Sequence, residues 1–329
     1  MRIVVTGATG FIGCQLAQIL AGRGHDLVAT GRAASTVESA RLERLKQAGV
    51  RVEVGSLLDP GFADKLTKTC EIVIHLAAAQ HEGNVPDSYF RDINVNGTRL
   101  LVEAAIGAGA RRFVYGSTIG VYGEASDQEL TEQTPPRPEN IYAVTKLEAE
   151  QVVSAHSSRI ETCIARISET YGPGDFRLLK LFRAIDRGAF VMLGSGQNVR
   201  QVIYVDDLAE GLWLAAEHPG AVGQTFVFAG TEVMTTNTMV QQIADALKHR
   251  PPRLRVPVWP FRAAAAVLEN TLRPLGIQPP LTQRRLDFFT KSFLFSTAKY
   301  RQTLGFVPQV SFAEGAAATA DWYRKQGYL

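Results

Sequence analysis

The stretch RIVVTGATGFIG, residues 2–13, combines a short apolar run with three glycines that are spaced three residues apart. The apolar run predicts a buried strand, and the residues that follow the glycines predict a helix. Gly7, Gly10 and Gly13 then form the turn between the two. Such a turn lets backbone N–H groups approach an anion and aims the positive end of the helix at it. A dinucleotide pyrophosphate is the ligand that this strand–turn–helix order favours.

Strand-like and helix-like stretches alternate from this turn through about half of the chain. Apolar, β-branched runs predict strands at 2–6, 27–30, 50–55, 71–78, 112–118 and 162–167. Helical periodicity predicts helices at 11–22, 36–48, 91–108 and 141–155. The alternation indicates an α/β protein with a Rossmann-type, doubly wound parallel sheet that helices cover on both faces.

The regular alternation ends where glycines and prolines cluster in YGPGD. We therefore expect a dinucleotide-binding Rossmann domain in residues 1–170 and a smaller, irregular C-terminal substrate-binding domain in residues 171–199 and 231–329. Residues 200–230 are expected to return to the first domain, because QTFVFAG, 224–230, has the pattern of one more strand of the main sheet.

The composition excludes several classes of function. With 46% apolar and 20% charged residues and a net charge of +3, the chain of 329 residues is typical of a soluble globular protein. Its densest basic segment, KHRPPRLR at 248–255, has no interleaved aromatic residues, so no nucleic-acid partner is expected. No apolar run approaches the ~18 residues that span a bilayer, so no membrane partner is expected. The cysteines and histidines lack metal-ligand spacing, and the N-terminus lacks a signal-peptide pattern, so we expect a cytoplasmic protein without a metal site.

The end of the second expected strand indicates which dinucleotide binds. A carboxylate at this position would hydrogen-bond the ribose 2′-hydroxyl of NAD and repel the 2′-phosphate of NADP. The position holds Gly31, and Arg32, whose guanidinium can pair with a phosphate, follows it. The sequence therefore favours NADP over NAD, unless Arg32 is an ordinary solvated arginine.

A tyrosine and a lysine that are four residues apart, Tyr142 and Lys146, lie in the expected helix 141–155. Residues at this spacing share one face of a helix, so the two side chains project into the same space. An ammonium near a phenol lowers the pKa of the phenol. The tyrosine could then exchange a proton with a substrate hydroxyl or carbonyl while a hydride is transferred. Such pairs also arise by chance in structural helices, so the rest of the sequence decides their meaning.

Seven motifs follow one another along the chain: TGATGFIG (6–13), HLAA (75–78), NVNGT (94–98), STIGVYG (117–123), YAVTK (142–146), YGPGD (171–175) and YVDDLAEG (204–211). In this order the chain resembles, over essentially its whole length, the extended short-chain dehydrogenases/reductases of the NAD(P)-dependent epimerase/dehydratase family. The resemblance implies an enzyme that transfers a hydride between a nicotinamide cofactor, NADP or NAD, and a small-molecule substrate. It also implies a homodimer, formed through the helix that carries Tyr142 and the helix before it.

The resemblance assigns roles to residues of these motifs. Thr118, Tyr142 and Lys146 would be catalytic, and Asn94 would support the lysine through the structure or through water, unless it only caps or bends its helix. The implied cofactor-binding residues are Gly7, Thr9, Gly10, Phe11, Ile12, Gly13, Arg32, Ser56, Leu57, Leu76, Ala77, Ala78, Ser117, Tyr142 and Lys146.

The residues after the catalytic threonine bear on the type of reaction. Family members that dehydrate sugars carry Asp-Glu directly after the threonine, as the acid and base of the elimination. This chain carries Ile119 and Gly120, which cannot move a proton. The resemblance therefore implies an oxidoreductase or epimerase rather than a 4,6-dehydratase.

The candidate substrate-binding residues give opposite indications. Nucleotide-sugar enzymes of the family have an asparagine near the diphosphate where this chain has Glu169, and a carboxylate is unfavourable there. Arg200, however, matches a family arginine that contacts the diphosphate, and Arg284 and Arg285 lie close to the expected position of a second one, unless they only form a solvated helix face. Ser117 completes the predicted set.

Three hypotheses follow. The first is hydride transfer at a secondary alcohol or ketone of a nucleotide sugar. The second is the same chemistry on an apolar hydroxy or keto compound, as in the 3β-hydroxysteroid dehydrogenases and dihydroflavonol reductases. The apolar segment 256–270 could line the pocket for such a compound, or could be an ordinary amphipathic helix. The third is a cofactor-sensing protein without catalysis, which the presence of both Tyr142 and Lys146 disfavours.

Overall fold

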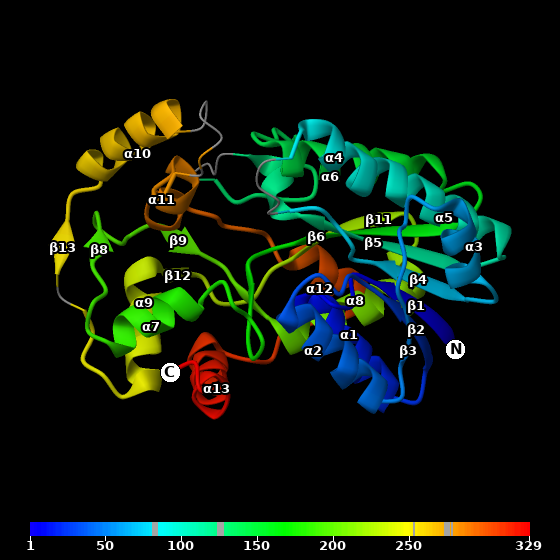
Figure 1. The fold of residues 1–329 in the computed structure, drawn as a ribbon, viewed down its shortest axis with the longest axis horizontal. Coiled ribbons are helices and arrows are strands. Elements are labelled where there is room, and N and C mark those ends of the chain that lie inside the picture. The colour runs from blue at the N-terminus through cyan, green and yellow to red at the C-terminus, as the bar shows by residue number, and fades with distance from the viewer. Residues whose placement is uncertain (81–84, 124–127, 253, 273–276, 278) are drawn as a thin grey trace.

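The computed structural model describes residues 1–80, 85–123, 128–252, 254–272, 277 and 279–329, without the side chains of residues 284 and 285. The described residues form one seven-stranded sheet with the order β11-β6-β5-β4-β1-β2-β3 (Figure 1). Its strands are β1 (Arg2–Thr6), β2 (Asp26–Thr30), β3 (Arg51–Glu53), β4 (Ile72–His75), β5 (Arg112–Thr118), β6 (Glu161–Ile167) and β11 (Gln224–Phe228). All neighbouring strands are parallel, so the predicted doubly wound parallel sheet is confirmed.

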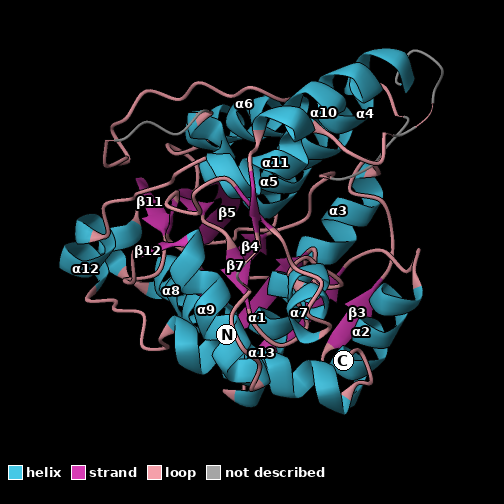
Figure 2. Cartoon of the chain, turned by 90° about the vertical axis from the view of Figure 1, so that its left-hand side faces the viewer, coloured by secondary structure: helices cyan, strands magenta, loops and turns pink. Residues whose placement is uncertain are grey.

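Side chains of β1 alternate between the two faces of the sheet, as strand geometry requires. Ile3 and Val5 belong to the core on one face, and Val4 belongs to the core on the other. The first core is covered by α1 (Phe11–Gly22), α2 (Thr36–Gln47), α8 (Val205–Glu217) and α12 (Ala298–Leu304), and the second by α3 (Pro60–Thr67), α5 (Gly97–Gly107) and α6 (Ile141–Ala155). Figure 2 shows the strands between these two groups of helices.

The helix predicted at 91–108 is interrupted. The structure has α4 (Asp87–Arg91), a π-helical segment (Asp92–Asn96) and then α5. A π-helical segment fits an extra residue into a turn and often lies at a functional site. Here the segment buries Asn94, which is 1% exposed.

The remaining elements form a second part with its own core, on the left of Figure 1. Its helices are α7 (Leu179–Asp186), α9 (Thr236–Leu247), α10 (Trp259–Leu272), α11 (Gln283–Thr290) and α13 (Phe312–Lys325). Short strands pair two by two in the described chain: β7 (Thr170–Tyr171) with β10 (Ile203–Tyr204), β9 (Val199–Arg200) with β12 (Met234–Thr235), and β8 (Met192–Leu193) with β13 (Arg255–Val256). Phe182, Ile243 and Tyr323 join α7, α9 and α13 in one apolar cluster. The domain boundaries predicted from the sequence stay a prediction.

Across the residues that the structure describes, none of the helices is both long enough and apolar enough to span a bilayer. The same residues contain no group of three or more histidines, cysteines or acidic side chains placed to hold a metal ion.

Candidate active site

The loops after β1 and β4 lie against each other at the carboxyl edge of the sheet. A Cβ atom at Gly7 would be 2.7 Å from the backbone nitrogen of Ala77, and Gly7 has a φ of +69°. These loops flank the point where the strand order reverses, and doubly wound sheets bind ligands at such a point. Gly7, Leu76, Ala77 and Ala78 therefore border the predicted cofactor site.

The helix after the glycine turn has an open N-terminus. Gly10 is the N-cap of α1 and has no side chain that could cap it. A Cβ atom at Gly13 would be 2.4 Å from the carbonyl oxygen of Gly7, so the turn has no room for a side chain there. The N–H groups of Phe11 and Ile12 are thus left to bind an anion, and the turn fits a dinucleotide pyrophosphate.

The end of β2 has little room for a carboxylate. A Cβ atom at Gly31 would be 2.4 Å from Oγ1 of Thr9 in the glycine turn. Arg32 follows and is exposed. Ser56, exposed, and Leu57, half-buried, come after the neighbouring strand β3 at the same edge. The predicted residues for the adenosine end of a cofactor therefore follow two adjacent strands.

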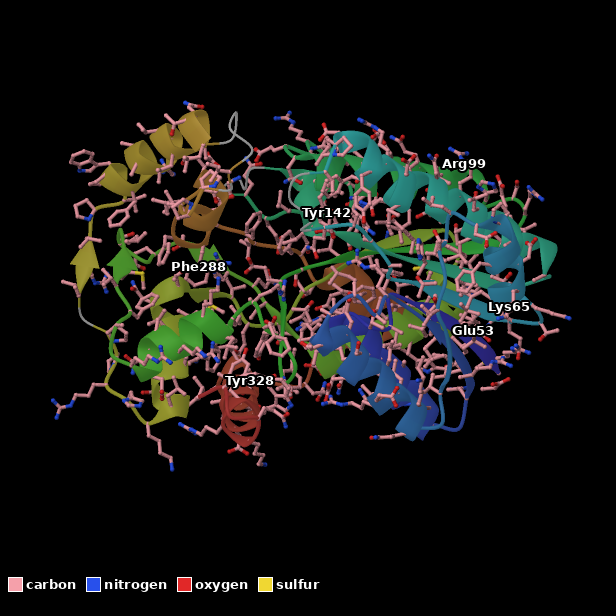
Figure 3. The ribbon with its side chains drawn as sticks, viewed as in Figure 1. Glu53, Lys65, Arg99, Tyr142, Phe288 and Tyr328 are labelled. Atoms are coloured by element: carbon pink, nitrogen blue, oxygen red, sulfur yellow. The ribbon has the colours of Figure 1, made fainter. Side chains whose placement is uncertain are left out.

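Helix α6 carries Tyr142 in its first turn and Lys146 one turn later. Asn140 begins the helix, because its side chain accepts a hydrogen bond from the backbone nitrogen of Ala143 at 3.0 Å. The helix spans residues 141–155, as the sequence predicted. Figure 3 shows Tyr142 at the end of this helix that faces the second part of the chain.

The side chain of Lys146 is buried under the end of the sheet and is 1% exposed. Its Nζ donates a hydrogen bond to the carbonyl oxygen of Gly116 at 2.5 Å and lies 4.1 Å from the centre of the Tyr115 ring. Burial lowers the pKa of Lys146 to about 7, against the opposing charge of Glu150, which raises it. A group with this pKa changes its charge near neutral pH.

Thr118 is the last residue of β5, two residues after the carbonyl that Lys146 contacts. Its Oγ1 accepts a hydrogen bond from the backbone nitrogen of Gly120 at 3.1 Å and caps a short 3-10 helix (Ile119–Tyr122). This contact uses the oxygen as an acceptor and leaves the hydroxyl proton to be donated. Strand β5 and helix α6 thus bring the predicted threonine, tyrosine and lysine to one edge of the sheet.

Asn94 connects the loop after β4 to the helix of the tyrosine and lysine. Its Oδ1 accepts a hydrogen bond from the backbone nitrogen of Ala79 at 2.7 Å, and its Nδ2 donates to Oγ1 of Thr145 at 2.9 Å. Because Thr145 directly precedes Lys146, this bridge holds the lysine's turn of α6 against the cofactor-side loop.

Ser117 points into a buried ion pair. Its Oγ donates a hydrogen bond to Oε1 of Glu150 at 2.5 Å. Oε2 of Glu150 lies 2.7 Å from Nη2 of Arg166, and the two side chains are 5% and 8% exposed. Arg166 also donates to the hydroxyl of Tyr122 at 3.0 Å. The hydroxyl of Ser117 therefore has a partner inside the protein, and its predicted cofactor and substrate contacts stay predictions.

Glu169 and Arg200, both predicted to bind substrate, pair with each other. Nη1 of Arg200 bonds to Oε2 of Glu169, and Nη2 donates to the carbonyl oxygen of Phe288 at 2.8 Å. The guanidinium also lies 4.2 Å from the centre of the Phe288 ring. The Arg200 side chain is 2% exposed, whereas that of Glu169 is 44% exposed. Arg284 and Arg285 belong to α11, but their side chains lie outside the described residues.

A cavity of about 510 Å³ lies in the second part of the chain. Its apolar lining includes Val258, Trp259 and Phe289, and its polar lining includes Asn198. Nδ2 of Asn198 donates to the carbonyl oxygen of Phe288 at 3.0 Å, which is the oxygen that Arg200 also contacts. Asn198 thus connects the lining of this open cavity to Phe288, which also holds Arg200, and the volume of the cavity is typical of a small-molecule pocket.

Two residues of this region were missed by the sequence analysis. Arg41 donates to the carbonyl oxygens of Thr9 at 3.1 Å and of Gly174 at 2.7 Å, and so ties the glycine turn to YGPGD. Glu150, on helix α6, forms the buried ion pair with Arg166. Its position four residues after Lys146 was a usable signal, because both share a helix face. No local pattern indicates Arg41, whose acceptors are main-chain atoms of distant loops.

Known proteins match the chain along its length. The sequence model of the NAD dependent epimerase/dehydratase family matches residues 3–229. The dTDP-glucose 4,6-dehydratase of Streptomyces griseus is 29% identical over 338 residues, which cover 98% of this chain and 94% of that protein. The 2-alkyl-3-oxoalkanoate reductase of Stenotrophomonas maltophilia is 30% identical over 331 residues, which cover 96% and 97%. The crystal structure of UDP-glucuronic acid 4-epimerase from Bacillus cereus in complex with NAD has the same fold, with a TM-score of 0.81, 24% identity and coverage of 100% of both chains.

Proposed function

The chain belongs to the NAD-dependent epimerase/dehydratase family and is an enzyme of the extended short-chain dehydrogenase/reductase type, and we propose that it transfers a hydride at a secondary alcohol or ketone. The observation that carries the proposal is the grouping of Thr118, Tyr142 and Lys146 at the carboxyl edge of the sheet. The glycine turn, whose open helix N-terminus fits a pyrophosphate, lies at the same edge.

In this proposal each of the three side chains has one task. A bound nicotinamide dinucleotide supplies the hydride chemistry. The phenolic oxygen of Tyr142 takes a proton from a substrate hydroxyl during oxidation, or returns one to a carbonyl during reduction. The ammonium of Lys146 stabilises the phenolate, because opposite charges within a few ångströms favour the ionised form. The hydroxyl of Thr118 donates a hydrogen bond to the substrate oxygen.

We propose NADP rather than NAD as the preferred cofactor. Gly31 offers no carboxylate to repel a 2′-phosphate, and Thr9 crowds the position that such a side chain would need. The exposed Arg32 next to it can pair with a phosphate. NAD remains the alternative.

The reaction is proposed to be an oxidoreduction or an epimerisation. A 4,6-dehydration also needs an acid and a base beside the threonine, and Ile119 and Gly120 provide neither. An oxidoreductase releases the oxidised or reduced product, whereas an epimerase returns the hydride to the same substrate. Dimerisation through α5 and α6 and a cytoplasmic location stay predictions.

Two substrate classes fit this chemistry. The first class is nucleotide sugars, which appear in the names of relatives such as the dTDP-glucose 4,6-dehydratase and the UDP-glucuronic acid 4-epimerase. A compound without a nucleotide is the second class, as the name 2-alkyl-3-oxoalkanoate reductase indicates for another relative. In the lining of the cavity, the apolar side chains of Val258 and Phe289 can contact such a compound, whereas Arg262 can contact a phosphate of the first class.

The experiment that tests the reaction compares Tyr142→Phe with Tyr328→Phe. Both variants lose one phenolic oxygen, but Tyr328 lies in the second part of the chain, away from Tyr142 (Figure 3). NAD(P)H formation or consumption is followed with UDP-glucose, dTDP-glucose and a panel of neutral secondary alcohols and ketones. Tyr142→Phe should lower kcat by about 10²- to 10⁴-fold and leave dinucleotide binding unchanged, whereas Tyr328→Phe should resemble the wild type. Equal activity of Tyr142→Phe and the wild type would refute the proposal.

A further inference from the structure

Glu169 lies just beyond the end of the strand that neighbours the catalytic threonine. The register of β5 and β6 pairs Thr118 with Ile167, and Glu169 comes two residues later. Parallel strands end at the same edge of a sheet, where doubly wound folds bind their ligands. Glu169 therefore lies at the carboxyl edge of the sheet, where the proposed reaction occurs.

The segment 288–291 contacts Arg200 at one end and the start of helix α6 at the other. Phe288, which contacts Arg200, is followed by Lys291, whose Nζ lies 3.0 Å from Oε2 of Glu139. Glu139 directly precedes the residue that caps α6. The Glu169–Arg200 pair is thus connected, through one short segment, to the helix end that presents Tyr142.

In the Glu169–Arg200 pair the carboxylate is exposed to solvent and the guanidinium is buried. The Arg200 side chain is 2% exposed and is enclosed by Glu169 and by the ring and carbonyl group of Phe288, whereas 44% of the Glu169 side chain is exposed. Partial burial would raise the pKa of Glu169, but the charge and the hydrogen bond of Arg200 outweigh it and lower the pKa below its ordinary value. The carboxylate that an incoming molecule meets is therefore ionised at neutral pH.

Two other cations of this region, Lys291 and Arg177, each pair with a carboxylate. Lys291 pairs with Glu139 at 3.0 Å, and Nε of Arg177 lies 3.2 Å from Oδ1 of Asp175. A diphosphate placed beside Glu169 would meet a like charge at close range. It could use Arg200 only if that side chain left its carboxylate partner.

We propose that Glu169 accepts a hydrogen bond from an uncharged donor group of the substrate, a hydroxyl or an amide, and excludes a diphosphate from this position. The inference rests on the proposed function and selects the second of its two substrate classes. The substrate is then a hydroxy or keto compound that carries no nucleoside diphosphate and has a hydrogen-bond donor besides the reacting oxygen.

The test measures binding and does not depend on turnover. The melting temperature of the protein, saturated with whichever of NAD⁺ and NADP⁺ binds more tightly, is measured with and without 5 mM UDP or dTDP. The variants are Glu169→Gln, which keeps the shape but removes the charge and leaves Arg200 without its counter-charge, and Glu210→Gln, which breaks an exposed ion pair between Glu210 on α8 and Arg23 at the end of α1. We expect no shift for the wild type and Glu210→Gln, and a rise of about 2 °C or more for Glu169→Gln.

Either of two results would overturn the inference. The first is a wild type that UDP or dTDP stabilises as strongly as Glu169→Gln, because the carboxylate then excludes nothing. The second is a Glu169→Gln protein that responds to neither nucleotide, because another feature then keeps diphosphates out.

Turnover separates this inference from the reaction itself. With a neutral diol or hydroxy ketone that the wild type converts, Glu169→Gln should raise KM about tenfold and leave kcat within about twofold, because the lost contact lies away from the reacting atoms. An unchanged KM would count against the role of Glu169. If no substrate gives turnover that depends on Tyr142, the proposed reaction fails, and the nucleotide-binding comparison still decides the role of Glu169.

Discussion

The side chain of Thr9 occupies the space that a side chain at Gly31 would need, since a Cβ atom there would be 2.4 Å from Oγ1 of Thr9. The Thr9 side chain in the glycine turn thus packs directly against the backbone at the end of β2. In the proposed cofactor complex, a carboxylate at position 31 would contact the 2′-hydroxyl of NAD and repel the 2′-phosphate of NADP, and this chain has none there.

Introducing a carboxylate at this position should change the cofactor preference once the Thr9 side chain is removed and the backbone nitrogen of Thr9, which would lie 2.8 Å from the new Cβ atom, has shifted. We expect the ratio of the NADP⁺ Kd to the NAD⁺ Kd to be at least about tenfold higher in the double variant Thr9→Ala/Gly31→Asp than in the wild type. Isothermal titration calorimetry measures both constants. Gly31→Asp alone should be less stable than the double variant because of the clash. Thr9→Ala alone is the control and should keep the wild-type preference. An unchanged preference in the double variant would mean that the ribose 2′-position lies elsewhere.

Arg32 should contribute to NADP⁺ binding and not to NAD⁺ binding. Its Nε lies 3.7 Å from Oε1 of Glu38, and the arginine side chain is 58% exposed, so this contact costs little to break. We expect Arg32→Ala to weaken NADP⁺ binding about tenfold and to leave the Kd of NAD⁺ unchanged. Arg51→Ala is the control, because Arg51 is also exposed but begins β3, where it pairs in register with Val28 before the carboxyl end of the strand. Equal losses for both dinucleotides would show a general effect on the loop instead of phosphate recognition.

The two asparagines of the π-helical segment should differ in their effect on stability. Asn94 is buried and bonds to Ala79 and Thr145, whereas Asn96 is exposed and bonds to Asp92. Asn94→Ala leaves buried polar partners unsatisfied and should lower the free energy of unfolding by about 1–3 kcal/mol. Asn96→Ala should change it by less than about 0.5 kcal/mol. Urea denaturation measures both, and similar losses would argue against a special role of the Asn94 bridge.

Elements with a strong local pattern were predicted closely from the sequence. The helices at 11–22 and 141–155 and the strand at 112–118 have the predicted bounds. In each, apolar periodicity and a capping or turn residue act within a few positions of one another. The interruption at Asp92–Asn96 could not be predicted in this way, because it depends on the contacts of Asn94 with a loop and with another helix.

The placement of candidate site residues could be predicted where they are close to one another along the chain. Tyr142 and Lys146 share a helix face, and Gly7 has the positive φ that its turn requires. The sequence indicated Glu169 and Arg200 as opposing signals about the substrate, but not as partners of each other. Their pairing depends on how β7 and β9 are brought together across the second part of the chain, which the local sequence does not encode.

The buried Lys146 should make the stability of the cofactor-free protein depend on pH. Burial lowers its pKa to about 7 in the folded protein, whereas an unfolded chain has a lysine pKa of about 10.4. Between these values the unfolded chain binds more protons, so the free energy of unfolding rises with pH. Relative to Lys146→Met, the wild type should gain up to about 1.4 kcal/mol per pH unit between pH 7.5 and 9.5. Urea denaturation across this range measures the difference, and a constant difference would mean that Lys146 stays ionised in the folded protein.

Two glutamates on α6 offer a matched comparison of a buried and an exposed ion pair. Glu150 pairs with Arg166, and their side chains are 5% and 8% exposed. Glu148 pairs with Arg91, and theirs are 35% and 49% exposed. Glu150→Gln leaves the guanidinium of Arg166 buried without a counter-charge, so it should lower the free energy of unfolding by about 3–5 kcal/mol. Glu148→Gln should lower it by no more than about 1 kcal/mol, because solvent already screens that pair.

Glu150→Gln should also change the pKa of Lys146. The charge of Glu150 raises the pKa of Lys146, so its removal lowers that pKa further and leaves fewer lysines ionised at pH 7. Lys146 makes the free energy of unfolding rise with pH, and in Glu150→Gln this rise should begin at a lower pH than in the wild type. In Glu148→Gln it should begin at the same pH as in the wild type. Urea denaturation of the three proteins between pH 6 and 9 measures this shift. Parallel curves for Glu150→Gln and Glu148→Gln would mean that Glu150 supports the fold through Arg166 and Ser117 without setting the charge of Lys146.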